Sequence, residues 1–314
     1  MPTQHRRFSL NHQHPFGVRR RAALAMAMLG GAGVLLAANG CGLANQFKDK
    51  VHLTSTQSIQ HIAGSALSVE TGNGSVSVEA ADRADVGIEV DLYGHDQARL
   101  QLAIVHAQRT DDGSLSIWVE WPGERRNGEG ASIEIDIPEV DGLDVASSNG
   151  AITISGLSGH AELQTSNGSI NIQQHKGSAW AKTSNGSINA SQVSGGLDLR
   201  SSNGKAVISD AGGKVRVQTS NGPIKVSMAD ANTSPVDLNT SNGGITIEVG
   251  DRFQGVLKCN TSNAKIKLEI EGQPELGKSA KGSMRLEFEG SDQLSTVKTS
   301  NGSVRVVKRA PSHP

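Results

Sequence analysis

A short motif that returns at a fixed spacing constrains the fold of this chain more than any other feature. The segment Thr-Ser-Asn-Gly-Ser-Ile-Asn begins at Thr165 and again at Thr183, and related Asn-containing triplets recur at the same interval in the centre of the chain and at a slightly longer interval after it. Self-similarity at a fixed period is typical of a solenoid, in which each repeat stacks on its neighbours. The Asn residues of the motif are Asn73, Asn149, Asn167, Asn185, Asn203, Asn221, Asn242, Asn263 and Asn301.

Two degenerate copies fill longer gaps between these Asn residues. The segment TDDGSLSI places Asp112 where an Asn would stand, and SAKGSMRLE places Lys281 between Asn263 and Asn301. Counted in this way, the copies continue at nearly the same period toward both ends. The sequence therefore predicts one continuous solenoid, with a separate N-terminal sheet as the alternative.

Aliphatic residues recur at four fixed positions around each Asn. Two of these positions precede the Asn and two follow it, and around Asn167 they are Ala161, Leu163, Ile170 and Ile172. Mostly polar residues separate them, which is the pattern of strands with one buried face. Each repeat thus predicts strand, corner, strand and loop. The fold class predicted is all-β, a parallel β-solenoid (β-helix) with coils of about 18–21 residues, right-handed by the general rule for parallel crossovers.

The composition agrees with stacked short strands. Only nine of the 314 residues are Phe, Trp or Tyr, whereas 37 are Gly, so the chain is poor in aromatic anchors and rich in residues suited to corners. With two Cys residues the chain cannot build a disulfide framework. Cys259 falls in an aliphatic column, with Leu238 one coil before it, and we expect it to be a small buried residue.

The Asn-Gly corner has a structural interpretation and several functional alternatives. Asn and Gly tolerate positive φ, stacked Asn side chains can hydrogen-bond from coil to coil, and the Thr or Ser two places before each Asn forms a hydroxyl column. Calcium-binding β-rolls need Asp at the repeated position, and phosphate cradles need a following helix. A ladder for ice or sugar needs an exposed flat array. We interpret the motif as a structural corner, with no metal and no cofactor.

The N-terminal segment 1–41 resembles an export signal. Five Arg residues and no acidic residue come before Asp49, an apolar run covers residues 22–38, and Ala38-Asn39-Gly40 precedes Cys41. Small residues before a Cys resemble the lipobox of bacterial lipoproteins, and the run is short for a membrane span. The Arg pairs also resemble a twin-arginine signal. We predict lipidation of Cys41, a plain cleaved signal being the alternative.

Charge and composition outline the rest of the chain. Without residues 1–40 the chain carries 25 basic and 31 acidic side chains, a net charge of −6, which argues against nucleic acid as a partner. The predicted organisation is a signal peptide at 1–40, a lipid-anchored tether at 41–60, degenerate coils or a capping sheet at 61–130, the regular solenoid at 131–307 and a disordered tail at 308–314.

Three segments resemble the bacterial putative-adhesin family of β-strand-repeat proteins. They are the TSNGSI copies, the segment IEIDIPEVDGLDVASSNGAITISGLSG at 133–159 and LSVETGNGSVSVEAADRADVGIEV at 67–90. The resemblance covers about residues 60–307. It implies a location in the cell envelope and a solenoid fold, and it supplies no catalytic residues.

One outward column contains a residue, Trp180, that has no evident part in stacking the coils. At the equivalent place in successive coils stand Asp144, Glu162, Trp180, Asp198, Arg216, Asp237 and Lys258, and the alternating charges from Asp198 onward predict surface ion pairs between neighbouring coils. An outward Trp180 near Glu162, Lys182, Asp198 and Arg200 predicts a sugar-stacking or contact patch, unless another segment covers it. Trp118 and Trp121 lie outside the regular repeats, and we expect them in the core and in the cap of the solenoid.

Signs of catalysis are sparse. Asp144 and Glu162 are the one pair of acids on successive coils, and His160 and His175 lack a third partner for a metal site. We therefore predict a non-catalytic lipoprotein of the cell envelope, held at a membrane by its lipid. Its solenoid would be an adhesion, binding or scaffold surface for an envelope protein or a glycan. The alternatives are a polysaccharide-binding or polysaccharide-degrading β-helix and a structural or stress-linked accessory.

Overall fold

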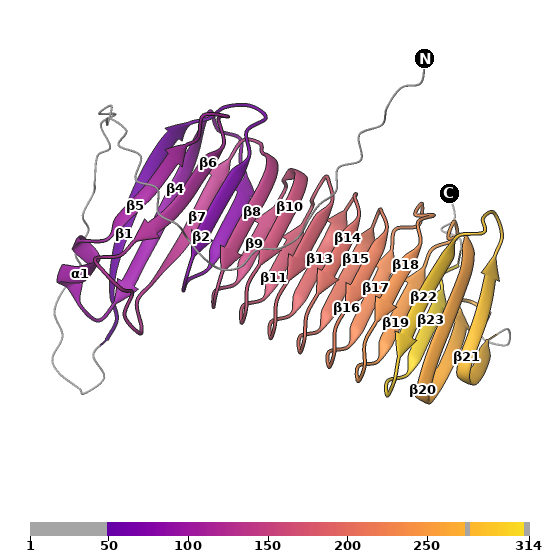
Figure 1. Cartoon of the computed structure of the whole chain (residues 1–314). Coiled ribbons are helices and arrows are strands. Elements are labelled where there is room, and N and C mark those ends of the chain that lie inside the picture. Colours follow the sequence, from indigo (N-terminus) through magenta and orange to yellow (C-terminus); the bar gives the residue numbers. More distant parts are fainter. Residues whose placement is uncertain (1–48, 274–276, 311–314) are drawn as a thin grey trace, which may run out of the picture. The chain divides into compact units, whose positions relative to one another are not determined.

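The part of the chain that the structure describes consists mainly of β-strands. The computed structural model describes residues 49–273 and 277–310, and these contain strands and one short helix, α1 (Gln97–Gln101). The repeats form the two largely parallel ladders of a β-solenoid, which we name ladder A and ladder B (Figure 1). The fold class predicted from the repeat is confirmed.

Ladder A contains the strands that come before each corner. Their side chains alternate between the core and the outer surface. In spatial order they are β6 (Leu115–Glu120), β2 (Leu67–Thr71), β8 (Asp141–Ser147), β10 (Ser158–Gln164), β12 (Ala179–Lys182), β14 (Leu197–Arg200), β16 (Val215–Gln218), β18 (Val236–Asn239), β22 (Leu294–Thr299) and the first half of β20 (Gly255–Ile270).

Ladder B contains the strands that follow each corner. In spatial order they are β7 (Gly130–Ile137), β3 (Val76–Ala80), β9 (Ile152–Ser155), β11 (Ile170–Gln173), β13 (Ile188–Val193), β15 (Ala206–Ala211), β17 (Ile224–Met228), β19 (Ile245–Val249), β23 (Val304–Lys308) and the second half of β20.

The four aliphatic columns form the core, as the spacing predicts. Ala161, Ala179 and Leu197 are register partners on successive strands of ladder A, each one repeat from the next, and all are buried. The columns on both sides of the corners are buried throughout. Burying a Val, Leu or Ile side chain contributes about 1.5–3 kcal/mol, so stacking supplies the core that a single coil cannot build.

At both ends the coils do not stack in chain order. The coil of β2 and β3 lies between that of β6 and β7 and that of β8 and β9. At the other end the last coil, β22 and β23, lies between β18–β19 and β20. Cys259 therefore pairs with Val297, and Val297 pairs with Leu238. The expected contact between Leu238 and Cys259 is wrong.

The two degenerate copies are not coils. Asp112 lies in the turn between β5 (Ile104–Arg109) and β6, which pair antiparallel. Lys281 lies in β21 (Lys278–Phe288), which pairs antiparallel with β20 as a cover for the end of the stack. In both places the predicted coil is wrong, because the chain turns back on itself instead of completing a circuit.

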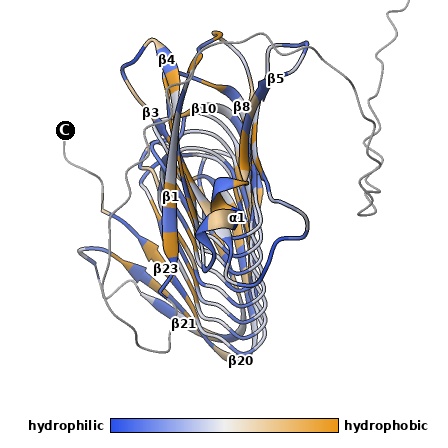
Figure 2. Cartoon of the chain, turned by 90° about the vertical axis from the view of Figure 1, so that its left-hand side faces the viewer, coloured by the Kyte–Doolittle hydropathy of each residue, from blue (hydrophilic) through white to orange (hydrophobic). Residues whose placement is uncertain are grey.

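Antiparallel strands also close the N-terminal end. β1 (Val51–Gln60) pairs with β4 (Asp85–Gly94), and β4 pairs with β7. β1 occupies the second half of the segment that the sequence predicts to be a tether. The helix α1 packs against β1 and β4 and buries Leu100 at this end, and Figure 2 shows it in front of the stacked coils.

The corner glycine is needed for space and, except at Gly74 with its φ of +130°, not for positive φ. Gly168 and Gly186 lie outside the left-handed region, as do the corner Asn residues, so the expected reason for the Asn-Gly pair is wrong. A Cβ on Gly186 would overlap the carbonyl group of Gly168 in the preceding coil. Ala264 replaces the glycine after Asn263, where β20 runs on through the corner as one continuous strand. The last corner is thus the one that admits a side chain.

The corner side chains form two hydrogen-bonded columns. The amide of Asn185 donates to Asn167 at 2.7 Å, and Asn203 donates to Asn185 at 2.7 Å. The Thr183 hydroxyl donates to the Gly168 carbonyl at 3.0 Å and accepts from the backbone N–H of its own coil. The amide ladder links, in spatial order, Asn73, Asn149, Asn167, Asn185, Asn203, Asn221, Asn242, Asn301 and Asn263.

Candidate functional site

Several sequence predictions fall outside the residues that the structure describes. The signal at 1–40, the lipidation site Cys41 and the end of the tail at 311–314 are among them. Within the part of the chain that is described, no helix has the length and apolarity to cross a membrane.

The predicted patch on ladder A is brought together by the strand register. Trp180 on β12 lies between Glu162 on β10 and Asp198 on β14, and Lys182 is the register partner of Arg200. Trp180 is partly buried while Glu162 and Lys182 are exposed. Strands about 4.8 Å apart hold these side chains on one regular surface.

Charges within this patch are partly paired. The guanidinium of Arg200 donates to both carboxylate oxygens of Asp198, from Nε at 3.1 Å and from Nη2 at 2.9 Å. This hydrogen bonding raises the pKa of Arg200. Among the described residues, Glu162 and Lys182 make no ion pair, so the patch offers Trp180 with an accessible carboxylate on the neighbouring strand and an accessible ammonium group on its own strand.

The alternating ion-pair ladder exists only in part. Arg216 lies 3.6 Å from Asp237, as predicted. Asp198 instead pairs with Arg200 in its own strand, and Asp237 accepts a hydrogen bond from Thr296 at 2.7 Å. The inserted β22 separates Asp237 from Lys258, which removes that predicted pair.

Three carboxylates lie on ladder A next to the Trp180 patch. Asp144 and Glu162 are register partners on β8 and β10, and Glu70 lies on the neighbouring β2. Although Asp144 is exposed as a residue, the surrounding strands desolvate its carboxyl group, and this raises its pKa. The charges of Glu162 and Glu70 raise the pKa of Asp144 further.

A cavity of about 230 Å³ opens beside β2 and β6. Trp118 is partly buried, and it projects outward from ladder A as the register partner of Glu70. His106 stacks on Trp118 with 4.7 Å between ring centroids. The expectation that Trp118 belongs to the core is therefore wrong, whereas Trp121 does pack against the core. The lining residues are Glu70, Thr71, Gly72, Trp118, Val119, Trp121 and Arg125.

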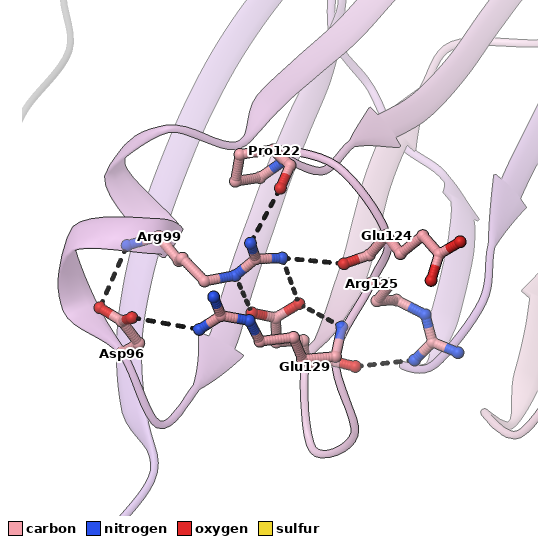
Figure 3. A network of polar contacts seen from close by, with 7 residues as sticks. Asp96, Arg99, Pro122, Glu124, Arg125 and Glu129 are labelled. Atoms are coloured by element: carbon pink, nitrogen blue, oxygen red, sulfur yellow. Dashed lines mark hydrogen bonds and ion pairs between the residues drawn. The ribbon is translucent and has the colours of Figure 1, made fainter.

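The loop that carries Trp121 and Arg125 is fixed by a buried ion pair (Figure 3). Arg99 donates to both carboxylate oxygens of Glu129, from Nε at 2.6 Å and from Nη2 at 3.1 Å. It also donates to the carbonyls of Pro122 and Glu124. The hydrogen bonds from Arg99 lower the pKa of Glu129 despite its burial. The loop at 121–129 is thus held at several points by one guanidinium group.

Arg125 is positioned by the same loop. Its Nη1 donates to the Glu129 carbonyl at 2.8 Å, and its guanidinium lies against Gly72, where an added Cβ would stand 3.1 Å from Nε and 3.4 Å from Nη2. Every other Asn-containing copy of the motif has Ser at the place of Gly72. In the sequence, this cavity is indicated only by the departure of Gly72 from the repeat, and the aliphatic columns carry no sign of it.

A larger cavity lies near the C-terminal end of the stack, where β20, β21 and β23 meet. Its charges largely pair with each other. Glu269 accepts from Arg305 Nε at 3.0 Å and lies 2.8 Å from Lys267 Nζ, and these contacts lower the pKa of Glu269 to about 2. Glu248 lies 3.4 Å from Lys225. The pairing leaves this cavity few free charges.

The remaining reactive side chains have structural surroundings. His175 is buried, and its Nε2 lies 3.1 Å from the Gly159 carbonyl. Cys259 is buried in its column, and burial raises the pKa of its thiol to about 12. The described residues hold no group of three His, Cys, Asp or Glu side chains that could bind a metal ion.

The chain was compared with curated proteins and with solved structures. Curated proteins give no match. The chain resembles the solved structure of a putative adhesin from Bacteroides fragilis at 11% identity, with 82% of this chain and 97% of that chain covered and a TM-score of 0.37. It resembles that of a putative adhesin from Parabacteroides distasonis at 14% identity, with 81% and 96% covered and a TM-score of 0.32. It also resembles a putative cell adhesion protein from Clostridium sporogenes, at 11% identity, covering 82% and 99% with a TM-score of 0.23.

The family model gives the assignment. Residues 64–307 match the model of the DUF4097 family, described as Toastrack DUF4097. The match includes the regular coils and the antiparallel strand β4, though not β1, and it spans most of the chain. The protein belongs to the Toastrack DUF4097 family.

Proposed function

We propose that this protein is a non-catalytic binding protein of the cell envelope, held at a membrane by a lipid on Cys41. Its ladder A serves as the adhesion surface, for a glycan or for another envelope protein. The observation that carries the proposal is the position of Trp180, an outward indole on a rigid strand between Glu162 and Asp198. An indole that offers an apolar face beside charged groups suits a sugar ring or a protein side chain.

The rigidity of the surface supports this function. Trp180 stands on β12, whose strand neighbours on both sides are in regular parallel register. A surface that does not need to become ordered on binding loses less conformational entropy. The stacked coils fix the spacing between side chains on this surface, and fixed spacing favours binding.

The test is quantitative capture from intact envelopes. The Trp180→Ala variant should bind its crosslinked partner at least about tenfold more weakly, because the truncation of a central Trp is typical of the costliest interface changes. Gln218→Ala, two coils further along ladder A, is the matched control and should bind like wild type. Equal capture by the Trp180→Ala and wild-type proteins would exclude this patch. The anchor is tested separately, because fatty-acid labelling that persists in Cys41→Ala would contradict lipidation at that residue.

A second candidate function is polysaccharide cleavage, which the adjacent Asp144 and Glu162 favour. The raised pKa of Asp144 suits a general acid, and Glu162 on the next strand would be the second carboxylate. Cleavage would be supported if the wild-type protein released reducing ends from an envelope polysaccharide and the Asp144→Asn variant did not. Absence of release with retained capture would support the binding function.

A further inference from the structure

We propose that the cavity beside β2 and β6 is a binding subsite for a carboxylated sugar. It lies apart from the Trp180 patch, and the proposal does not depend on that patch being functional. The proposal rests on the combination of two indole rings, one guanidinium group and one carboxylate around a cavity of about 230 Å³. That volume suits a single pyranose ring with its substituents.

The aromatic groups provide the wall against which a sugar ring would pack. Trp118 is fixed by His106, which stacks on it at an interplanar angle of 13° and is itself held by Glu120 at 2.8 Å. Trp121 packs against the core beside it. Two indoles immobilised before binding present apolar surface at little cost in side-chain entropy.

Arg125 supplies the charge that selects an acidic sugar. Its Nη1 is occupied by the Glu129 carbonyl, and in the described part of the chain Nε and Nη2 have no hydrogen-bond partner. These two groups form the fork that binds a carboxylate with two parallel hydrogen bonds. Glu70, on the opposite strand of the cavity, is an acceptor for a sugar hydroxyl.

The site is built by a local departure from the repeat. The guanidinium of Arg125 lies where a side chain at residue 72 would contact it, and Gly72 leaves that space open. At the same motif position the other copies have Ser. The loop at 121–129 is in turn held by Arg99 and Glu129, so Arg125 is set in place before any ligand arrives (Figure 3).

The experiment is a fluorescence titration of the full-length protein carrying Trp180→Phe. The chain has three Trp residues, so in this variant all indole emission comes from Trp118 and Trp121. The ligands are a galacturonic acid trisaccharide and its methyl ester, which has nearly the same shape without the charge. We expect the acid to change the emission saturably and to bind at least about tenfold more tightly than the ester.

Two further variants locate the site. Arg125→Gln should remove the preference for the acid and leave the ester unaffected. Gly72→Ser restores the residue found in the other copies, so it should fold normally and weaken acid binding at least about tenfold by displacing Arg125. The proposal would be overturned by equal affinity for the acid and the ester, or by no emission change with either. Full binding of the acid by Gly72→Ser, or an emission change only with an acidic peptide, would overturn it as well.

Discussion

Gly243 and Gly244 are neighbours in the chain, yet an added Cβ would overlap another coil's backbone only at Gly243. A Cβ on Gly243 would overlap the carbonyl group of Gly222, whereas one on Gly244 would lie 3.5 Å from the nearest atom, the Ser303 carbonyl oxygen. Neither residue has a positive φ. At Gly243 the corner glycine is thus a packing requirement, and the same requirement recurs wherever one corner stacks directly on the next.

This difference predicts opposite outcomes for two adjacent substitutions. Gly243→Ala should lower the free energy of unfolding by about 3 kcal/mol or more, because the backbones of two coils must separate. Gly244→Ala should change it by less than about 1 kcal/mol. Urea unfolding followed by circular dichroism measures both. Similar losses for the two variants would contradict the packing explanation.

His175 occupies a column position that is aliphatic in neighbouring coils. Leu157 stands one repeat before it and Val193 one repeat after it, and all three are buried. Nε2 of His175 lies near the carbonyls of Gly159 and Ser178, while Nδ1 has no hydrogen-bond partner among the residues that the structure describes. Desolvation lowers the pKa of His175 below its ordinary value of 6.5, so the folded protein prefers the neutral ring.

The lowered pKa predicts a loss of stability in acid. Below about pH 6.5 the unfolded chain binds a proton at His175 that the folded chain does not, so the free energy of unfolding falls as the pH falls toward the folded pKa. His175→Val, copying Val193, should remove this pH dependence. Melting temperatures of both proteins at pH 8 and pH 5 are the measurement, and the gap between the proteins should be larger at pH 5. An equal gap at both pH values would show that His175 does not titrate on unfolding.

At the scale of elements, the loop at 121–129 depends on Glu129. This carboxylate is 4% exposed, and Arg99 is its ion-pair partner. Removing one member of a buried pair leaves an uncompensated charge and costs about 3–5 kcal/mol. Glu129→Gln should therefore increase hydrogen exchange throughout the loop. Glu124→Gln is the matched control, because Glu124 contributes only its backbone carbonyl to Arg99 (Figure 3).

The pH dependence gives a second measurement on the same element. Hydrogen bonding to Arg99 lowers the pKa of Glu129 below its ordinary value of 4.5. The stabilisation is then present above about pH 4.5 and is lost as the pH falls through the folded pKa. In Glu129→Gln this acid-dependent change in loop exchange should be absent. If the variant and wild type lose protection alike in acid, Glu129 is not the titrating group.

Elements differ in how far the sequence could predict them. The strands from β8 to β19 follow from the aliphatic columns, because period-two alternation and the constant repeat length specify both burial and register. The cavity beside β2 and β6 could not be derived in this way. Trp118, Trp121 and Arg125 come from a segment without the repeat, and only the fold brings them to Gly72.

At the scale of the whole molecule, the periodic sequence does not specify the spatial order in which the coils stack. Nearly every coil has aliphatic residues in the same columns and an Asn at the corner, so these columns alone do not specify which coil stacks on which; even the last coil, with Ser295 in the column of Leu257, fits between two others. The antiparallel β20–β21 pair decides the order at one end, because β21 covers the far edge of β20 and leaves the other edge for β22 and β23. The inserted coils then join segments that are distant in sequence.

This arrangement predicts that the last coil holds the end of the molecule in place. Deleting residues 294–314 removes β22 and β23 from between β18–β19 and β20, so the amides of β20 and β21 should lose their protection from hydrogen exchange. Deleting only residues 311–314 is the control and should leave them protected. β20 carries the same corner residues, Thr261 and Asn263, and could in principle pair directly with β18 and β19. Retained protection in the longer deletion would mean that it does so, and that chain order is an accessible alternative to the inserted coil.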